Sequence, residues 1–191
     1  MKVLRRVAVY TLFLLLGACA TTQPQPQPTP TQPYQQESIL IEAESFFGRG
    51  AQGVADVLNR VFTDNGTPDA YIKGEEGSGS LGFGLRYGHG TLYLSDGTTS
   101  QVYWNGPSVG FDVGSSASKV FVLIYDLQTI NDLYQRFSGV EGSLFFMGGV
   151  GVNYNRRNNI TLAPVRLGVG LRMGVSVGYL HLSPNRTWFP L

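Results

Sequence analysis

Apolar and small residues alternate along residues 166–181, which read RLGVGLRMGVSVGYLH. Every second side chain from Leu167 to Tyr179 is apolar, and the positions between them are mostly glycine. A period of two is typical of a β-strand with two unlike faces, because successive side chains point to opposite sides of a sheet. The pattern predicts one long strand with a bulky apolar face and a smooth face of small residues.

The same alternation of bulky residues and glycine recurs at residues 81–87, 109–113 and 149–154. Glycine inside a strand weakens it, so repeated glycine on one face requires a structural reason. The usual reasons are a tight bend, as in a barrel, or the close approach of another backbone or a ligand. We therefore expect a curved sheet with one bulky and one smooth face.

Turn-forming residues separate the apolar segments into short strands. We expect turns at residues 88–90, 95–98, 105–107 and 156–159. The strands predicted between them span residues 70–73, 80–87, 91–94, 101–104, 108–114, 119–126, 140–147, 150–155, 160–165 and 166–181. This arrangement favours a mainly β fold, a small closed or strongly curved antiparallel β-barrel of about eight strands. Closure also removes exposed sheet edges.

Two short amphipathic helices are expected to pack on this barrel. The first spans residues 53–62, where apolar residues recur at the spacing of one helical face, and Asn65-Gly66 ends it. The second follows Thr129, continues through Phe137 and ends at Gly139. It is the expected cover for the strand at residues 119–126, which is apolar on both faces. Residues 39–50 are interpreted as an acidic lead-in that ends with an aromatic pair.

The N-terminus predicts export and lipidation. Residues 1–18 contain a basic start, a short apolar run and small residues, and Leu16-Gly17-Ala18-Cys19 resembles the bacterial lipobox. This resemblance implies a mature N-terminus at Cys19 that carries acyl chains such as palmitate; an ordinary signal peptide with an incidental cysteine is the alternative. Alanine rather than aspartate after Cys19 favours the inner leaflet of the outer membrane, with the protein in the periplasm.

Three segments follow from this interpretation. Residues 1–18 are a lipoprotein signal peptide, residues 19–38 are the lipidated cysteine and a Gln/Pro-rich tether, and residues 39–191 are a single barrel domain. The alternation of glutamine and proline favours extended polyproline II conformations and cannot form a core. A proline-rich recognition motif is the alternative to a simple tether.

Composition narrows the possible partners. Removal of a leader that contains Lys2, Arg5 and Arg6 leaves 11 of the 14 basic residues and all 13 acidic ones. The net charge of the mature chain is therefore near −2. No strongly basic balance remains to suggest a nucleic-acid partner. Because Cys19 is the chain's single cysteine, an internal disulfide and a cysteine-based metal cluster are excluded. We expect no metal and no cofactor.

Four charged residues stand among the small residues of the expected strands: Arg86, Asp112, Arg166 and Arg172. If the bulky faces meet the helices outside the barrel, these four side chains line its lumen. The lumen would then be polar and suited to an anionic group, with Asp112 as a partner for the arginines. If the bulky residues fill the lumen instead, the arginines face bulk water.

A set of motifs resembles the EipA-type bacterial envelope proteins. These motifs are FFG at residues 46–48, AYI at 70–72, GEE at 74–76, LRYG at 85–88, VYW at 102–104, GPSVGFD at 106–112, GVEG at 139–142, VNY at 152–154, LAPVR at 162–166 and GVGLR at 168–172. The resemblance implies a small periplasmic β-barrel with a role in cell-envelope integrity, and it supplies no catalytic residues. A weaker resemblance to SYLF domains implies lipid binding.

Three functions compete at this point. The first is a non-enzymatic, membrane-anchored envelope protein that binds a lipid, a polysaccharide or another envelope protein. The second is an integral outer-membrane barrel, although several predicted strands are shorter than the roughly 9–11 residues that span a bilayer. The third is an envelope hydrolase. Only two histidines are present, and the adjacent Glu75 and Glu76 point to opposite faces of a strand, so catalytic pairing has little support.

Overall fold

The computed structural model describes residues 34–48, 51, 53–110, 118–140, 143–167 and 178–187, apart from the side chains of residues 78–84 and 108–110. They belong to one compact unit, Thr31–Leu191. The predicted signal peptide, Cys19 and most of the predicted tether lie outside the described residues.

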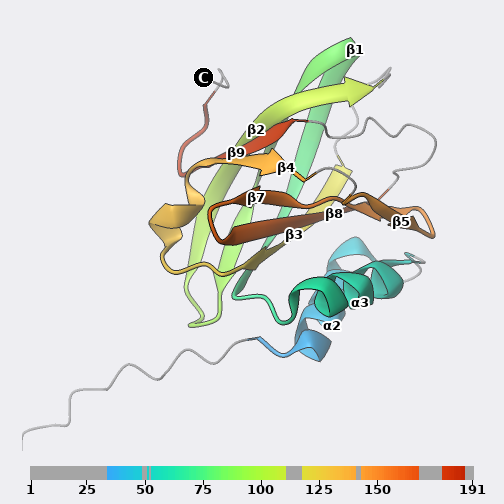
Figure 1. Ribbon diagram of the computed structural model, residues 1–191, viewed down its shortest axis with the longest axis vertical. Coiled ribbons are helices and arrows are strands. Elements are labelled where there is room, and N and C mark those ends of the chain that lie inside the picture. The colour runs from blue at the N-terminus through green and yellow to red at the C-terminus, as the bar shows by residue number, and fades with distance from the viewer. Residues whose placement is uncertain are drawn as a thin grey trace, which may run out of the picture. The chain divides into compact units, whose positions relative to one another are not determined.

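The described strands form one antiparallel sheet that closes on itself (Figure 1). The strands are β1 (Ala70–Leu94), β2 (Thr99–Gly110), β3 (Ser118–Tyr125), β4 (Arg136–Gly139), β5 (Phe145–Met147), β6 (Val150–Val152), β7 (Asn155–Arg157), β8 (Ile160–Leu167) and β9 (Tyr179–Ser183). Their order is β3-β1-β2-β9-β4-β7-β8-β6-β5, and pairing of β3 with β8 closes the ring. The predicted mainly β, antiparallel barrel is confirmed.

β1 doubles back, so that its two halves occupy neighbouring places in the wall. Residues 70–76 pair with β3, whereas residues 82–93 pair with β2. The rings of Tyr71 and Tyr93 stack with centroids 4.9 Å apart, and a Cβ added to Gly90 would lie 2.8 Å from the Cα of Gly74. With the halves of β1 counted separately, the closed ring has eight strands.

Even-numbered residues of β1, β2, β3, β8 and β9 face the barrel interior. One apolar cluster inside the barrel draws on all these strands, with members such as Ile72, Val102, Val122, Leu162 and Leu182. Leu133 and Phe137 also join this apolar cluster. Much of the lumen is therefore a packed apolar core.

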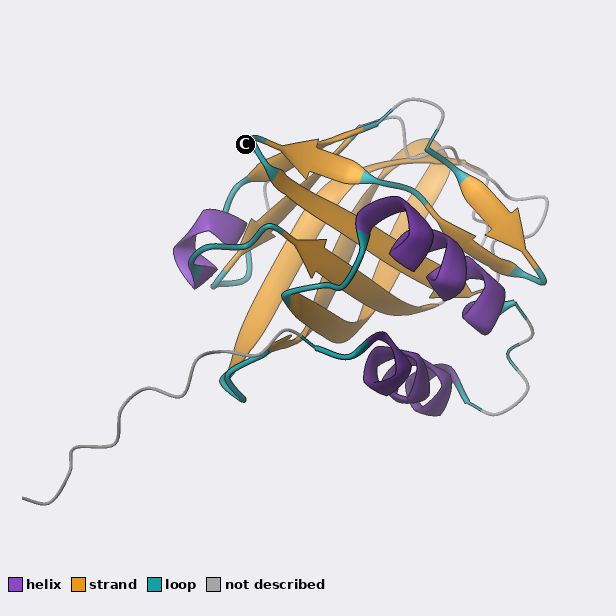
Figure 2. Cartoon of the chain, turned by 60° about the horizontal axis from the view of Figure 1, so that its bottom comes forward, coloured by secondary structure: helices purple, strands orange, loops and turns teal. Residues whose placement is uncertain are grey.

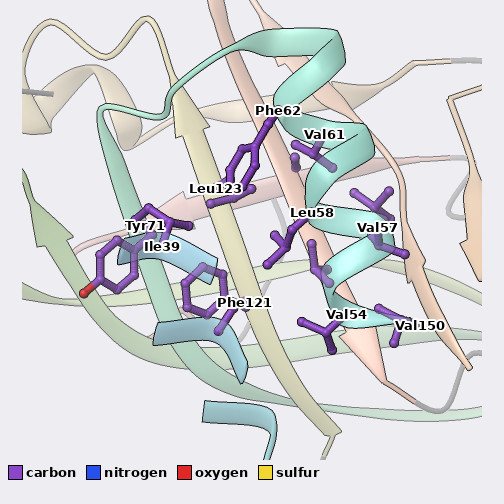
Figure 3. Packing of buried hydrophobic residues seen from close by; sticks show 14 of the residues in the cluster. Ile39, Val54, Val57, Leu58, Val61, Phe62, Tyr71, Phe121, Leu123 and Val150 are labelled. Atoms are coloured by element: carbon purple, nitrogen blue, oxygen red, sulfur yellow. The ribbon is translucent and has the colours of Figure 1, made fainter. Parts of the chain in front are cut away.

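Two helices cover one side of the barrel's outer wall, as Figure 2 shows. α2 (Gln36–Phe47) buries Ile39, Ala43 and Phe47, and α3 (Val54–Asn65) buries the apolar stripe predicted from the sequence. Their buried residues pack with odd-numbered residues of the wall, including Phe121 and Leu123 of β3 (Figure 3). None of the described helices has the length and apolar character needed to cross a membrane.

The position predicted for the second helix is wrong. Residues 130–137 form a short 3-10 helix, η1 (Ile130–Leu133), followed by strand β4. The second helix is α2, in the segment interpreted as a lead-in, and it begins at Gln36 within the predicted tether. β3 is buried on both faces as expected, but α2 and α3 cover its outer face, while Leu133 and Phe137 lie on the interior side.

Two predicted turns are also wrong. Residues 88–90 continue the second half of β1, where Gly88 pairs with Trp104 and His89 with Tyr103. Residues 105–107 likewise continue β2. Of the long strand predicted at residues 166–181, the structure describes the end of β8 at Leu167 and the part from residue 178, with β9 beginning at Tyr179; the residues between lie outside the described part.

Candidate functional site

Three charged side chains meet inside one end of the barrel, and we call them the interior cluster: Glu76, Arg86 and Arg166. The Nε of Arg166 donates to Glu76 Oε1 at 2.5 Å, and its Nη2 reaches Glu76 Oε2 at 3.4 Å. Arg86 Nη1 lies 3.9 Å from Glu76 Oε1. Glu76 has only 7% of its side-chain surface exposed, with 11% for Arg86 and 13% for Arg166. One buried carboxylate therefore serves two guanidinium groups.

Strand pairing explains why these distant residues meet. Arg166 of β8 lies opposite Val120 of β3, which in turn lies opposite Gly74 of β1. Glu76 is two residues beyond Gly74 and so shares its inward face. Arg86 returns to the same end of the interior because β1 doubles back. The cluster is a consequence of topology, with members 90 residues apart along the chain.

The side chain of Trp104, which belongs to β2, covers the interior cluster. Its indole Nε1 donates to Glu76 Oε2 at 3.2 Å, and the bond is buried. The ring lies over Gly74 and Gly88, where an added Cβ would overlap it. Glycine at these positions makes room for the indole. The smooth face of small residues predicted from the sequence points inward at these positions, where the tryptophan of the neighbouring strand covers it.

The surroundings of Glu76 keep it ionised. Burial raises the pKa of its carboxyl, but the charges of Arg166 and Arg86 and the hydrogen bonds from Arg166 and Trp104 outweigh burial and hold the pKa below its usual value. Arg166 also donates to Asn153 Oδ1 at 3.0 Å. The cluster carries two positive charges and one negative charge.

Of the four charged residues predicted to line the lumen, Arg86 and Arg166 face the interior and meet at Glu76. Asp112 and Arg172 lie outside the described residues. The sequence did not predict Glu76 as the counter-charge of the arginines or Trp104 as the side chain that covers the cluster. A signal for Glu76 exists, because it follows Ile72 and Gly74 at a period of two and so belongs to the inward face.

A second candidate site lies on the outside of the same strands, and we call it the outer groove. It is a cavity of about 230 Å³ whose described lining residues are Tyr87, Gly88, His89, Tyr103, Trp104, Arg186 and Thr187. Tyr87 and His89 project outward from β1, and Tyr103 projects outward from β2. The residues after β9 supply Arg186 and Thr187.

Two buried polar atoms beside the outer groove lack a hydrogen-bond partner: Asn105 Oδ1 and His181 Nδ1. Asn105 is 1% exposed, and its Nδ2 donates to Thr187 Oγ1 at 2.8 Å. His181 lies directly across from Asn105 on β9. Burial, followed by the nearby charge of Arg136, lowers the pKa of His181. Within the described residues, no group of three or more His, Cys, Asp or Glu side chains is arranged to bind a metal ion.

The fold and these sites define a small closed antiparallel β-barrel with a packed interior and two external helices. A solved structure from Brucella abortus, a β-barrel-like uncharacterised protein, is similar to this chain with a TM-score of 0.76 and 43% sequence identity. The match covers 83% of this chain and 99% of that one. No protein of curated function matches the sequence.

The family of envelope integrity protein A (EipA) matches residues 32–191, which include every described residue. The chain belongs to the EipA family. The resemblance inferred from its motifs is confirmed, and the family places its role in the integrity of the cell envelope.

Proposed function

We propose that this protein is a lipoprotein that supports envelope integrity from the periplasm, anchored by acylated Cys19 to the inner leaflet of the outer membrane. One observation carries the proposal: the chain's single cysteine ends the sequence Leu16-Gly17-Ala18-Cys19, directly after a short apolar leader. The Gln/Pro-rich residues that follow would hold the barrel away from the membrane surface.

The proposed role is non-enzymatic. The described interior is filled by apolar side chains at one end and by the interior cluster at the other. The carboxylate of Glu76 is already bound by Arg166, Arg86 and Trp104. We therefore assign it a structural role, in which it holds the strands together. We therefore expect the barrel to act as a rigid body whose outer surface contacts a lipid, a polysaccharide or another envelope protein.

The outer wall favours this arrangement over an integral membrane barrel. α2 and α3 occupy one side of the wall, and another side carries Tyr87, His89 and Asn105. A membrane-spanning barrel needs an apolar band around its whole outer surface. We therefore place the membrane contact in the acyl chains rather than in the strands.

Replacing the lipidated residue tests the proposal. In cells fed radiolabelled palmitate, Cys19→Ser should lose all label and leave the membrane fraction, because the lipobox resemblance places lipidation at Cys19, the chain's single cysteine. Thr22→Ser, three residues further along, is the matched control and should retain both label and location. Label that persists in Cys19→Ser would overturn the anchor. Full protection of a deletion strain against detergent by the unlabelled variant would show that anchoring is dispensable for envelope integrity.

A further inference from the structure

The chain reverses direction after β9 and crosses the outer face of β2. Ser183, the last residue of β9, lies opposite Tyr103 of β2. Pro184 follows, and proline lacks the N–H group that a further rung of the ladder would need. Thr187 then accepts a hydrogen bond of 2.8 Å from the side chain of Asn105, a residue that β9 has already passed. The chain has therefore folded back over the outer wall.

This return brings the chain to the outer groove. The groove has a volume of about 230 Å³, and both Arg186 and Thr187 belong to its described lining. Most of the other lining residues come from β1 and β2, where Tyr87, His89 and Tyr103 project outward. Consecutive Cα atoms are only about 3.8 Å apart. The residue after Thr187 therefore begins at the wall of the groove.

The residues that come next in the sequence are suited to this groove. Trp188 and Phe189 follow Thr187 and lie outside the described residues. Aromatic side chains favour stacked or edge-to-face contact with other rings, and the partly buried rings of Tyr87 and Tyr103 offer such contact. Ligand pockets commonly measure about 300–1,000 Å³. A groove of about 230 Å³ therefore fits one large side chain better than a free ligand.

We propose that the outer groove is the docking site of this chain's own Trp188. The indole packs on the ring of Tyr103, and the hydrogen bond between Asn105 and Thr187 sets the point from which the segment enters the groove. The segment thereby fastens the end of β9 to the outer face of β2. Docking fills the groove, so envelope partners contact other parts of the wall. This inference goes beyond the function proposed above and does not depend on the lipid anchor.

Nuclear Overhauser effects in the full-length protein, kept in detergent micelles, test the contact directly. Trp104 and Trp188 are the chain's two tryptophans, so Trp188→Phe assigns both indole signals. We expect effects from the indole protons of Trp188 to the ring protons of Tyr103 and Tyr87. A sample that mixes isotope-labelled and unlabelled chains shows whether these effects arise within one chain. We expect them within one chain.

Pairs of variants show whether the contact is energetically real. Trp188→Ala and Tyr103→Ala should each lower the urea midpoint, followed by the fluorescence of Trp104. Their double variant should fall no further than Tyr103→Ala alone, because residues in contact act non-additively. Gln101→Ala is the matched control and should add to Trp188→Ala, since Gln101 lies on the same face of β2, outside the groove's described lining. Should Tyr103→Ala fail to fold, His89→Ala takes its place.

Three results would overturn the proposal. An indole of Trp188 without effects to either tyrosine ring leaves the groove open to an external ligand. Effects found only between labelled and unlabelled chains place the segment in the groove of a second copy. Additive midpoints for Trp188→Ala and Tyr103→Ala show that the two side chains do not contact each other. Effects within one chain, together with non-additive midpoints, support the docking, wherever Cys19→Ser is found in cells.

Discussion

The interior cluster and the outer groove occupy opposite faces of the same strands but satisfy their polar groups differently. Trp104 points inward and donates to Glu76, which also accepts from Arg166. The next residue, Asn105, points outward and leaves its Oδ1 buried without a partner. Two consecutive residues of β2 thus belong to different polar networks: the network of Trp104 is fully paired, and that of Asn105 is not.

This difference indicates what each region is for. A buried charge network whose members bond to one another fixes a single packing of the strands that carry them. Buried polar atoms left without partners carry a desolvation cost that no hydrogen bond offsets. We therefore interpret the interior cluster as a stabilising network and the incompletely paired Asn105 and His181 as a less stabilising part of the wall. Stability should respond strongly to changes in the first and weakly to changes in the second.

The largest effect is expected for Glu76→Ala. It leaves two guanidinium groups buried together without their carboxylate, and removing one partner of a buried pair costs about 3–5 kcal/mol. The free energy of unfolding, measured by urea titration with tryptophan fluorescence, should fall by this amount. Glu75→Ala is the control, because Glu75 is the neighbouring residue and is exposed. A loss below about 1 kcal/mol for Glu76→Ala would show that the cluster is not structural.

A smaller loss is expected for Gly88→Ala, which acts at the wall between the two regions. The added methyl group would overlap the indole of Trp104, and overpacking typically costs about 1–3 kcal/mol. Displacing the indole should also weaken its bond to Glu76. Gly77→Ala in the same strand meets nothing within 4 Å and serves as the control. Equal melting temperatures for the two variants would mean that the indole does not need the space above Gly88.

Periodicity predicted the barrel and α3 because both depend on local patterns. It failed at residues 88–90, where glycines on either side of His89 have the composition of a turn. Gly88 makes room for the indole of Trp104, and Gly90 lies against the backbone of Lys73 and Gly74, and no local pattern reveals either tertiary contact. The helix expected at residues 130–137 failed for a similar reason. Leu133 and Phe137 share the spacing of a helical face, but the barrel interior buries both from a 3-10 turn and a strand.

The sites were predictable only in part. Arg86 and Arg166 stand out in the sequence because charges among glycines on one strand face need a special environment. Their meeting at Glu76 depends on which strands pair and in what register, and the alternation of residues carries no information on partners. The outer groove was harder still. His181 was assigned to a long strand of apolar and small residues, and Asn105 to a turn, so their pairing across β2 and β9 was not foreseen.

The smallest effect concerns His181 and pH. Because burial, and then Arg136, lower the pKa of His181, the unfolded chain binds a proton below about pH 6.5 that the folded chain does not. Stability should therefore be complete above pH 6.5 and decline as pH falls through the lower pKa of the folded state. Glu76 does not contribute in this range, because its lowered pKa keeps it ionised. Acidification from pH 7.5 to 5.5 should therefore reduce the stabilisation that depends on neutral His181 and leave the charges of the interior cluster unchanged.

Urea midpoints at pH 7.5 and 5.5 separate this contribution from others. His181→Gln should reduce the decline relative to the unsubstituted chain, since glutamine does not titrate. His89→Gln removes the chain's other histidine and should keep the part of the decline that comes from His181. The difference between the two variants should be smaller than the loss from Gly88→Ala, because the ring of His181 is only partly buried. An identical decline in His181→Gln and the unsubstituted chain would show that this histidine is not held neutral beside Asn105, and the contrast between the two faces would then rest on Asn105 alone.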